Sequence, residues 1–344
     1  MAVPTSGIEV VFTGLGGTEV VSTRTSPVRP PGPHRVLVRT EAAGVAFAEV
    51  QMLHGRYPAQ PANPFVPGYD LVGEIVAVGP EVTGWRVGQR VAALPVTGAW
   101  AEHVELRARD LVAVPDELAA ADAVAVVLNG VTAQQLLRAA NVRSGQTVLV
   151  HGIGGGVGIL LAQLAVNAGL RVIGTASARR HEALADLGVE LIDHRTSDVR
   201  SRVAELAPGG VDAIFDPFGP TSLDESWPML APGGTLVSYG SARTLHDSGP
   251  WWVPYLKTAG RIAKWEVLRL LGSTGDRRCR LYAIRSNDRF RADLEQLLRM
   301  VASGQLRPRI AGRFPLESAA QALDLHISGR ETGRIVLVPG LSAE

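Results

Sequence analysis

The seven residues from Gly152 to Gly158, GIGGGVG, are the segment of this chain whose residue types and spacing point most directly to a chemical task. They follow a short apolar run and precede a longer apolar run with helical spacing, so we expect a strand, a turn and a helix in that order. Because glycine has no Cβ atom, backbone N–H groups in such a turn can approach a phosphate, and the positive end of the following helix attracts the same anion. The strict GxGxxG pattern is absent, and glycine-rich turns also serve simple chain reversal. The strand and helix context favours a dinucleotide site.

The end of the next expected strand, residues 171–175, indicates which dinucleotide binds. An NAD enzyme places an acidic residue on the ribose hydroxyls about twenty residues after such a turn. Here the strand is followed by Ala-Ser-Ala-Arg-Arg at 176–180, without an acid. A hydroxyl and guanidinium groups suit a 2′-phosphate, because arginine offers a planar fork of donors. We therefore predict NADPH rather than NADH, bound through Ser177 and Arg180 with Arg179 as a helper. The alternative is that the arginines cap the next helix or lie in solvent.

Two different patterns of apolar and turn residues along the chain predict the elements that must position these residues. Residues 1 to about 115 consist of short alternating or apolar segments between turn residues, which predicts an all-β, barrel-like domain. From about residue 119 strands and helices alternate, which predicts parallel strands joined by right-handed crossovers. The chain then returns to strands near 307–310 and 333–338. The expected helices are 119–140, 157–167, 180–187 and 290–303, and the expected strands of the alternating part are 147–150, 171–175, 213–216, 235–239 and 280–284.

Composition limits the class of protein. A chain of 344 residues with 46% hydrophobic content is long enough for two domains. The formal net charge of +1 provides no electrostatic footprint for nucleic acid. The N-terminal residues lack a basic and a long apolar region, and no apolar run is expected to reach transmembrane length. Cys279 is the only cysteine, which excludes an internal disulfide and a thiolate cluster for structural zinc. We expect a cytoplasmic enzyme with a small-molecule substrate.

Motifs spread over nearly the whole chain give a more specific indication. They are GVAFAEV at 44–50, PFVPGYDLVG at 64–73, VGQRV at 87–91, GAWAE at 98–102, GVTA at 130–133, the glycine turn and GRIVL at 333–337. In this order they resemble the quinone oxidoreductase branch of the medium-chain dehydrogenase/reductases, and within it most closely the vesicle amine transport protein homologues. The resemblance implies a Rossmann domain with a parallel, doubly wound sheet plus a GroES-like β-barrel domain. It places the GroES-like substrate domain at 1–126, the Rossmann NADPH-binding domain at 127–286 and the return to the first domain at 287–344, and it implies a homodimer.

The resemblance also assigns site residues. Tyr57 resembles the family's phenol at the substrate and Thr132 the hydroxyl near the nicotinamide, and these two are the expected catalytic residues. His194 stands where relatives have a tyrosine beside the adenine phosphate. Ala46 stands where most relatives have an asparagine. The cofactor residues are expected to be Asn129, Thr132, Gly155, Gly156, Val157, Gly158, Ser177, Arg180, His194, Phe218, Tyr239, Gly240 and Ser241. The substrate pocket is expected to contain Ala46, Phe47, Gln51, Tyr57 and Trp252.

A catalytic zinc, which alcohol dehydrogenases of this superfamily use as a Lewis acid, is not expected. The first ligand position falls near Ala46, and Gly68-Tyr69-Asp70 replaces the usual Gly-His-Glu. One carboxylate such as Asp70 or Glu49 cannot make the site alone. The eight histidines show no paired spacing and are expected at the surface or at helix caps rather than as ligands.

These expectations favour an NADPH-dependent, zinc-independent reductase of a quinone or an α,β-unsaturated carbonyl compound. An enoyl-thioester reductase is a second interpretation, and a low-turnover NADPH-binding adaptor protein is a third. Residues 250–272, which hold three of the six tryptophans, fit a lid over a large apolar substrate, a dimer contact or a membrane-surface helix.

Overall fold

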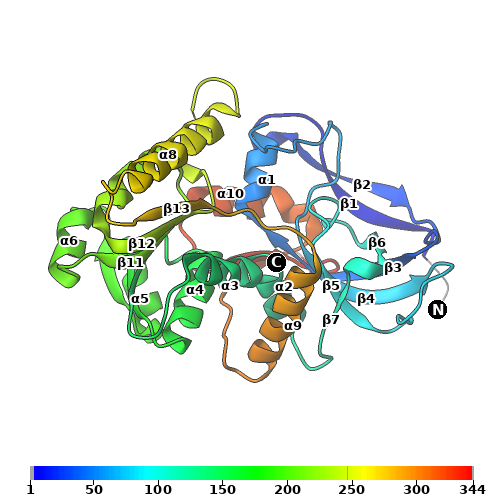
Figure 1. The fold of residues 1–344 in the computed structure, drawn as a ribbon. Helices are drawn as coiled ribbons and strands as arrows, with labels where there is room; N and C mark the ends of the chain where they lie inside the picture. Colours follow the sequence, from blue (N-terminus) through cyan, green and yellow to red (C-terminus); the bar gives the residue numbers. More distant parts are fainter. Residues whose placement is uncertain (1–3, 246, 343–344) are drawn as a thin grey trace. The chain divides into compact units, whose positions relative to one another are not determined.

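The computed structural model describes residues 4–245 and 247–342 and divides the chain into two compact units (Figure 1). The first unit contains the residues up to Val131 and those from Arg285 onward. The second unit is the segment Thr132–Ile284. The chain therefore leaves the first unit once and returns to it.

The second unit is built on a six-stranded sheet in the order β10-β9-β8-β11-β12-β13, and each neighbouring pair is parallel. The strands are β8 (Thr147–Val150), β9 (Arg171–Ala176), β10 (Glu190–Asp193), β11 (Val211–Asp216), β12 (Leu230–Ser238) and β13 (Arg278–Leu281). Its α-helices are α4 (Gly156–Asn167), α5 (His181–Leu184), α6 (Val199–Leu206), α7 (Pro220–Ser226) and α8 (Val253–Leu270). The predicted Rossmann domain is confirmed.

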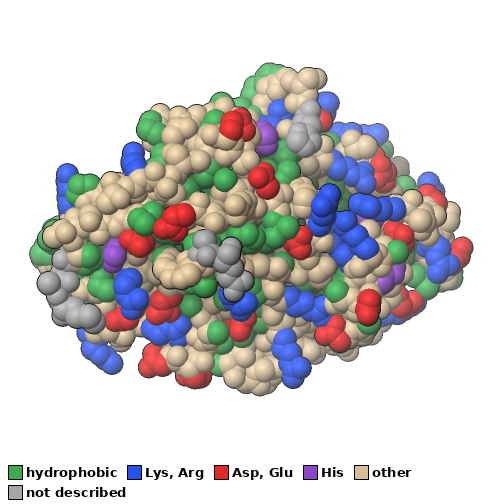
Figure 2. Space-filling view, turned by 180° about the vertical axis from the view of Figure 1, so that it is seen from behind, with side chains coloured by type: hydrophobic (Ala, Val, Ile, Leu, Met, Phe, Trp, Pro, Cys, Tyr) green, Lys and Arg blue, Asp and Glu red, His purple; other side chains and the backbone are tan. Residues whose placement is uncertain are grey.

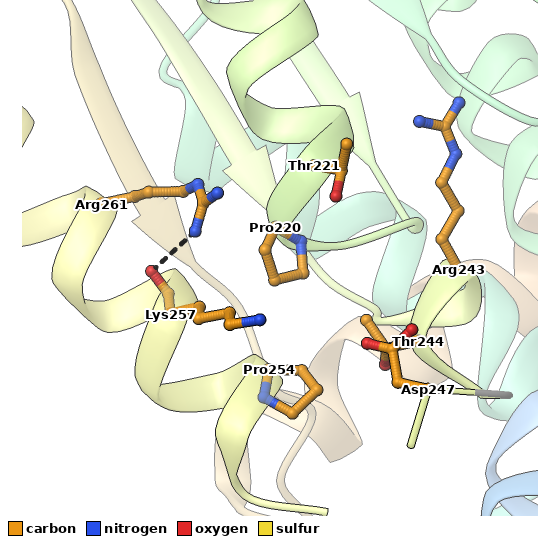
Figure 3. A pocket seen from close by; sticks show the side chains of 8 residues that line it. All are labelled: Pro220, Thr221, Arg243, Thr244, Asp247, Pro254, Lys257 and Arg261. Carbon is orange, nitrogen blue, oxygen red and sulfur yellow. Dashed lines mark hydrogen bonds between the residues drawn. The ribbon is translucent and has the colours of Figure 1, made fainter. Parts of the chain in front are cut away.

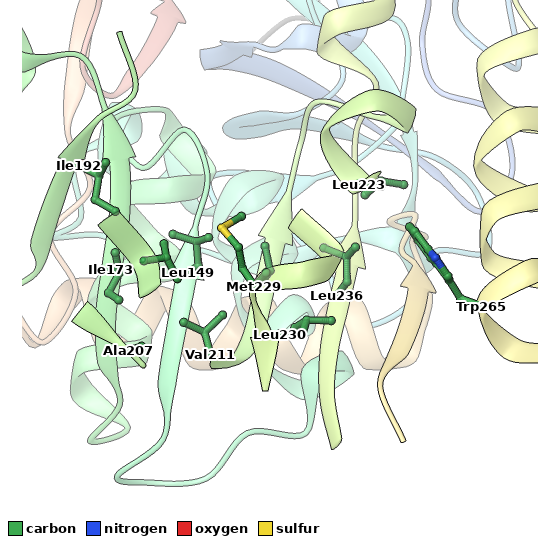
Figure 4. Close-up of a cluster of buried hydrophobic side chains, with 12 residues drawn as sticks. Leu149, Ile173, Ile192, Ala207, Val211, Leu223, Met229, Leu230, Leu236 and Trp265 are labelled. Carbon is green, nitrogen blue, oxygen red and sulfur yellow. The ribbon is translucent and has the colours of Figure 1, made fainter. Parts of the chain in front are cut away.

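Apolar side chains from several strands and helices make the core of this unit. Figure 4 shows Leu149, Ile173 and Leu236 from three different strands of the sheet within one cluster. Trp265 joins that cluster from α8, and its ring stacks on Trp227 with centroids 4.2 Å apart and planes 1° from parallel. Stacked aromatic rings bury a large apolar area. The stacking therefore fixes α8 against the core.

The first unit contains a β1-β2 hairpin and a seven-stranded sheet with the path β14-β15-β3-β4-β5-β7, in which β6 also pairs with β3. Strand β15 pairs antiparallel with β3, so the C-terminal residues complete a sheet begun near the N-terminus. The predicted GroES-like domain is confirmed. The strands are β1 (Ser6–Phe12), β2 (Val21–Pro27), β3 (Arg35–Val45), β4 (Leu71–Val78), β5 (Arg90–Ala93), β6 (His103–Arg107), β7 (Val112–Ala113), β14 (Ile310–Phe314) and β15 (Arg334–Leu337). The α-helices are α1 (Phe47–Leu53), α2 (Ala120–Val127), α9 (Asp288–Ala302) and α10 (Ala319–Ser328), and α3 (Asn129–Ala140) runs from this unit into the second.

The helical residues 120–140 differ from the expectation that no apolar run reaches transmembrane length. Residues 120–140, which comprise α2 and α3, have a mean hydropathy of 1.2 over an 18-residue window and are long enough to cross a membrane. The expectation that no run reaches that length was wrong. However, 67% of this window is buried inside the protein, as in the core helix of a globular domain.

The elements β10, α6 and α7 of the second unit were not predicted. Strand β10 has only four residues and lies at an edge of the sheet, so its apolar pattern is too short to stand out. The helix expected over 180–187 is instead a series of short turns, with α5 between two 3₁₀ segments.

Acidic and basic side chains are interspersed over the face shown in Figure 2. This distribution agrees with the nearly balanced formal charge of the chain.

Candidate active site

The glycine turn connects β8 to α4 in the second unit. Gly155 is the N-cap of α4 and supplies no side-chain hydrogen bond to it, so the first N–H groups of the helix have no partner within the helix or from its cap. A Cβ atom on Gly158 would lie 2.6 Å from the Gly152 carbonyl oxygen and 2.7 Å from the Ile153 Cα. This close approach requires glycine at position 158. The turn and helix end thus form a cradle of backbone donors of the kind that holds a pyrophosphate.

Ser177, Arg180 and His194 gather near this cradle, at the ends of β9 and β10. Ser177 is buried directly after β9, and the Arg180 side chain lies over the turn, with its Cδ 3.0 Å from where a Gly154 Cβ would stand. The pKa of His194 is lowered, first by desolvation and also by the positive charges of Arg195 and Arg180, against the charge of Asp193. Positive charge beside a buried hydroxyl would favour a bound phosphate.

Two further loops carry residues that were predicted to bind the cofactor. Phe218 follows β11, and Tyr239, Gly240 and Ser241 follow β12. Backbone bonds tie the loops together, since the N–H groups of Ala242 and Arg243 donate to the carbonyls of Pro217 and Phe218 at 3.0 Å each. A Cβ on Gly240 would collide with the Pro217 carbonyl oxygen, so glycine is needed there. The structure therefore brings these four predicted residues together.

His151 shows that one expectation about the histidines was wrong. It is buried with 7% exposure, not a surface or capping residue. Its Nδ1 lies 3.3 Å from Thr175 Oγ1 and its Nε2 3.0 Å from Ser226 Oγ. Thr175 Oγ1 in turn accepts from the Gly152 N–H at 3.1 Å. The imidazole thus links the glycine turn to α7.

Asp216, at the end of β11, completes this buried network. One carboxylate oxygen accepts the N–H groups of Phe218 at 2.8 Å and Gly219 at 3.1 Å, and the other accepts the Ser222 hydroxyl at 2.5 Å. The loop that carries Phe218 is therefore held by a carboxylate with 0% exposure.

The two predicted residues on α3 are both buried, but they belong to different units. Asn129 lies in the first unit, where its Oδ1 accepts from Arg334 Nη1 at 3.0 Å. Thr132 is the first residue of the second unit.

Four of the predicted substrate residues lie in the first unit. Ala46 is the N-cap of α1, and Phe47 and Gln51 are half-buried one turn apart on that helix. Tyr57 is half-buried in the loop that follows. The fifth, Trp252, lies in the second unit as the N-cap of α8 and is 48% exposed.

Tyr57 has a partner that sequence reasoning missed. The hydroxyl of Tyr69 lies 2.9 Å from that of Tyr57, and the two rings meet edge to face at 83° with centroids 6.2 Å apart. Tyr69 is 7% exposed. In the sequence, Tyr69 stood out only because it replaces the histidine of the usual Gly-His-Glu motif. No spacing or motif indicated a contact with Tyr57.

A buried charged cluster lies next to this pair. Arg334 Nη2 contacts Asp70 Oδ1 at 2.7 Å, while the other Asp70 oxygen accepts the Leu128 N–H at 3.1 Å. The two oxygens of Glu49 accept the N–H groups of Ala46 and Tyr69, each at 2.8 Å. Burial raises the pKa of Glu49 to about 7, although the Arg334 charge opposes this shift. Both carboxylates are thus engaged by protein donors.

The second unit also contains a cavity of about 270 Å³ between α7, the loop after Ser241 and α8 (Figure 3). Two of its lining arginines are paired with carboxylates, Arg243 with Glu225 at 2.7 Å and Arg261 with Asp224 at 2.6 Å. None of the residues predicted to bind cofactor or substrate lines this cavity. It therefore adds nothing to the nucleotide site.

Comparisons with known proteins bear on both units. The alcohol dehydrogenase GroES-like domain matches residues 32–116, and the zinc-binding dehydrogenase domain matches residues 185–337. The quinone oxidoreductase of Pseudomonas aeruginosa is 36% identical over 96% of this chain and 99% of its own length. The chain belongs to the quinone oxidoreductase branch of the medium-chain dehydrogenase/reductases. It is accordingly an oxidoreductase.

Two more relatives of this branch are informative. The synaptic vesicle membrane protein VAT-1 homolog of Rattus norvegicus is 32% identical over 97% of this chain and 85% of its own length. A mycobacterial protein solved in complex with NADPH is 32% identical, with a TM-score of 0.83 over 97% of this chain and 100% of the other.

One of the matching family descriptions names zinc, but the residues present in this chain do not fit a zinc site. Within residues 4–245 and 247–342, no group of three or more His, Cys, Asp or Glu side chains is placed to hold a metal. Asp70 and Glu49 point their oxygens at N–H and guanidinium donors, and burial raises the pKa of the Cys279 thiol to about 12, which disfavours the thiolate that a metal needs. The absence of zinc stays a prediction. Elemental analysis of protein purified without chelators tests it, and we expect well under one zinc per chain.

Proposed function

We propose that this protein is an NADPH-dependent, zinc-independent reductase that transfers hydride to a quinone or to the β-carbon of an α,β-unsaturated carbonyl compound. The observation that carries the proposal is the position of Arg180 against the glycine turn beside the buried Ser177, with no acid at residues 176–180. The structure of the mycobacterial relative with NADPH supports the same cofactor.

The residues of the second unit fit NADPH. The N–H groups at the start of α4 would bind the pyrophosphate, and Ser177 and Arg180 would bind the 2′-phosphate, with Arg179 and His194 beside them. The loops at Phe218 and at Tyr239–Ser241 would hold the nicotinamide end. Bound NADPH supplies the hydride.

The residues of the first unit fit the acceptor's oxygen. As electrons move from the reduced bond toward that oxygen, it becomes an enolate or a quinol oxygen and requires a proton or a donor. The Tyr57 hydroxyl is half-buried and is the donor we assign to this oxygen. Ala46 and Phe47 would shape an apolar wall beside it, with the polar Gln51 one turn further along α1, and the pocket has no side-chain amide at position 46.

The test is NADPH oxidation by the purified protein against a panel of quinones, enones and enoyl thioesters, with NADH as the matched control. We expect turnover with NADPH and a quinone or an enone. Turnover confined to enoyl thioesters would indicate the second interpretation from the sequence. Tight NADPH binding without turnover on any acceptor would reject the reductase and favour the adaptor.

A further inference from the structure

The Tyr57 and Tyr69 hydroxyls form a pair in which each phenol has one hydrogen to donate. Their oxygens are 2.9 Å apart, and either could be the donor by geometry alone. The hydrogen of the phenol that accepts within the pair remains for a group outside the pair. If Tyr69 donates to Tyr57, the Tyr57 hydrogen is not used within the pair and can be donated to a third group.

Tyr69 is the immobile member of the pair. Its N–H donates to Glu49 Oε1 at 2.8 Å, and its carbonyl accepts from the Val96 N–H at 3.2 Å. Gly68, directly before it, has φ +107°, and a Cβ there would lie 2.5 Å from the Trp100 backbone nitrogen. These contacts fix the direction in which the Tyr69 side chain leaves the backbone, while Tyr57 lies on a loop and is half-buried.

The surroundings of Tyr69 keep its phenol protonated. Burial is the largest cause that raises its pKa, followed by Tyr57 and by the charges of Glu49 and Asp70. A buried phenolate beside two carboxylates would be costly, so Tyr69 retains its hydrogen over the working pH range. Tyr69 therefore always has a hydrogen that it can donate to the Tyr57 oxygen.

We propose that Tyr69 is a positioning residue that donates to Tyr57 Oη and thereby directs the Tyr57 hydrogen toward the carbonyl oxygen of the acceptor. This inference rests on the proposed function and adds the group that orients its proton donor. In the reaction, the hydride forms the new C–H bond at the β-carbon, the carbon–carbon double-bond electrons move toward the carbonyl, and the oxygen takes the proton from Tyr57 Oη. Water then returns a proton to the Tyr57 phenolate, which the Tyr69 hydrogen bond stabilises in the meantime.

The experiment compares Tyr69→Phe, Tyr57→Phe and the double variant with the wild type, using Tyr282→Phe as the matched control. The Tyr282 hydroxyl donates to Gln135 at 3.0 Å, and Tyr282 is not among the residues assigned to cofactor or substrate. The readouts are kcat, KM for the acceptor, the Kd of NADPH, the melting temperature and the pH profile of kcat. Deuterated NADPH identifies an acceptor for which hydride transfer limits the rate.

We expect Tyr57→Phe to lower kcat about 10- to 1000-fold, the range for one lost donor to a developing oxyanion. Tyr69→Phe should lower kcat about 2- to 12-fold, the range for one neutral hydrogen bond, with the Kd of NADPH unchanged and a melting temperature close to that of the control Tyr282→Phe. The double variant should be no slower than Tyr57→Phe, because Tyr69 acts only through Tyr57.

The pH profile separates positioning from a structural role. A donated hydrogen bond stabilises the Tyr57 phenolate, so its removal in Tyr69→Phe should move the alkaline limb of kcat to higher pH. The charged groups near the pair include Glu49, Asp70, Arg334 and Arg56, which directly precedes Tyr57. Glu49, with a pKa of about 7, titrates well below that limb.

The outcomes distinguish this inference from the proposed function. A wild type that reduces no acceptor defeats the proposed function. A wild type that turns over, with loss in Tyr57→Phe but wild-type kcat and pH profile in Tyr69→Phe, overturns the role of Tyr69 alone. Losses that multiply in the double variant would also overturn it.

Discussion

At the scale of single residues, Arg180 is the side chain on which the choice of nucleotide depends. We expect Arg180→Ala to lose about 1.5–3 kcal/mol of NADPH affinity, the contribution of a hydrogen bond to a charged group, with little change for NADH. Fluorescence titration with both nucleotides measures this. Arg202→Ala is the control, because Arg202 is an exposed arginine of the same unit paired with Glu205 on α6. Equal wild-type affinity for NADPH and NADH would contradict the assignment.

His151 gives a prediction about pH and stability. Burial, the largest cause, lowers its pKa from 6.5 in the folded protein, against the opposing charge of Asp216. As pH falls through 6.5, the unfolded chain takes up a proton that the folded protein resists, so the free energy of unfolding should fall.

Thermal unfolding between pH 8 and 5 measures this effect in the wild type and in His151→Phe. The variant loses bonds to Thr175 and Ser226, so we expect it to be less stable by about 1–3 kcal/mol at pH 8. Its melting temperature should fall less steeply toward pH 5. Parallel curves for the two proteins would show that His151 titrates normally.

The predicted and the missed residues of the site differ in how their contacts are spaced along the chain. Ser177 and Arg180 could be predicted because they follow a strand that the glycine turn locates, within about thirty residues. The contacts of Asp70 with Arg334 and of His151 with Ser226 join residues 264 and 75 positions apart. No periodicity or local motif encodes such pairs, because they arise only when strands and helices pack.

At the scale of secondary structure, the elements that carry a strong local signal were predicted and the short ones were not. Strand β8 and helix α4 lie at their predicted positions within one residue, since an apolar strand, a glycine turn and an apolar helix follow one another. Helix α7 has seven residues and begins at Pro220, after Gly219 with φ 103°, so its sequence reads as a loop.

The contact between the glycine turn and α4 predicts contrasting effects for two glycines. Gly158→Ala would place a methyl group 2.6 Å from the Gly152 oxygen, forcing the turn and α4 apart, so we expect a loss of about 1–3 kcal/mol in unfolding free energy and weaker NADPH binding. Gly260→Ala, in the interior of α8, meets no atom within 4 Å and should stabilise by about 0.5–1 kcal/mol. Chemical denaturation measures both. Equal stability of the two variants would show that the turn can relax.

At the scale of the whole molecule, the segment 250–272 and the neighbouring edge strand β13 expose several large apolar side chains. Trp265 is buried, but Leu256, Leu270 and Leu271 of this segment are 63%, 72% and 71% exposed. Strand β13 is the last strand of its sheet, and its Leu281 is 57% exposed. An exposed strand edge with apolar side chains favours pairing with another chain.

We therefore predict a homodimer in which β13 pairs with its two-fold copy. Light scattering at micromolar concentration should give twice the 36.4 kDa mass of the chain. Leu281→Lys should shift the protein toward the monomer, because a two-fold axis brings the two lysines close together and an edge lysine opposes strand pairing. Leu15→Lys, in the first unit and 56% exposed, is the matched control and should remain dimeric. A dimer that survives Leu281→Lys but dissociates with Leu270→Lys would place the interface on α8 instead of the sheet edge. A monomeric wild type would leave both apolar surfaces without this partner and return the segment 250–272 to the lid or membrane-surface interpretation.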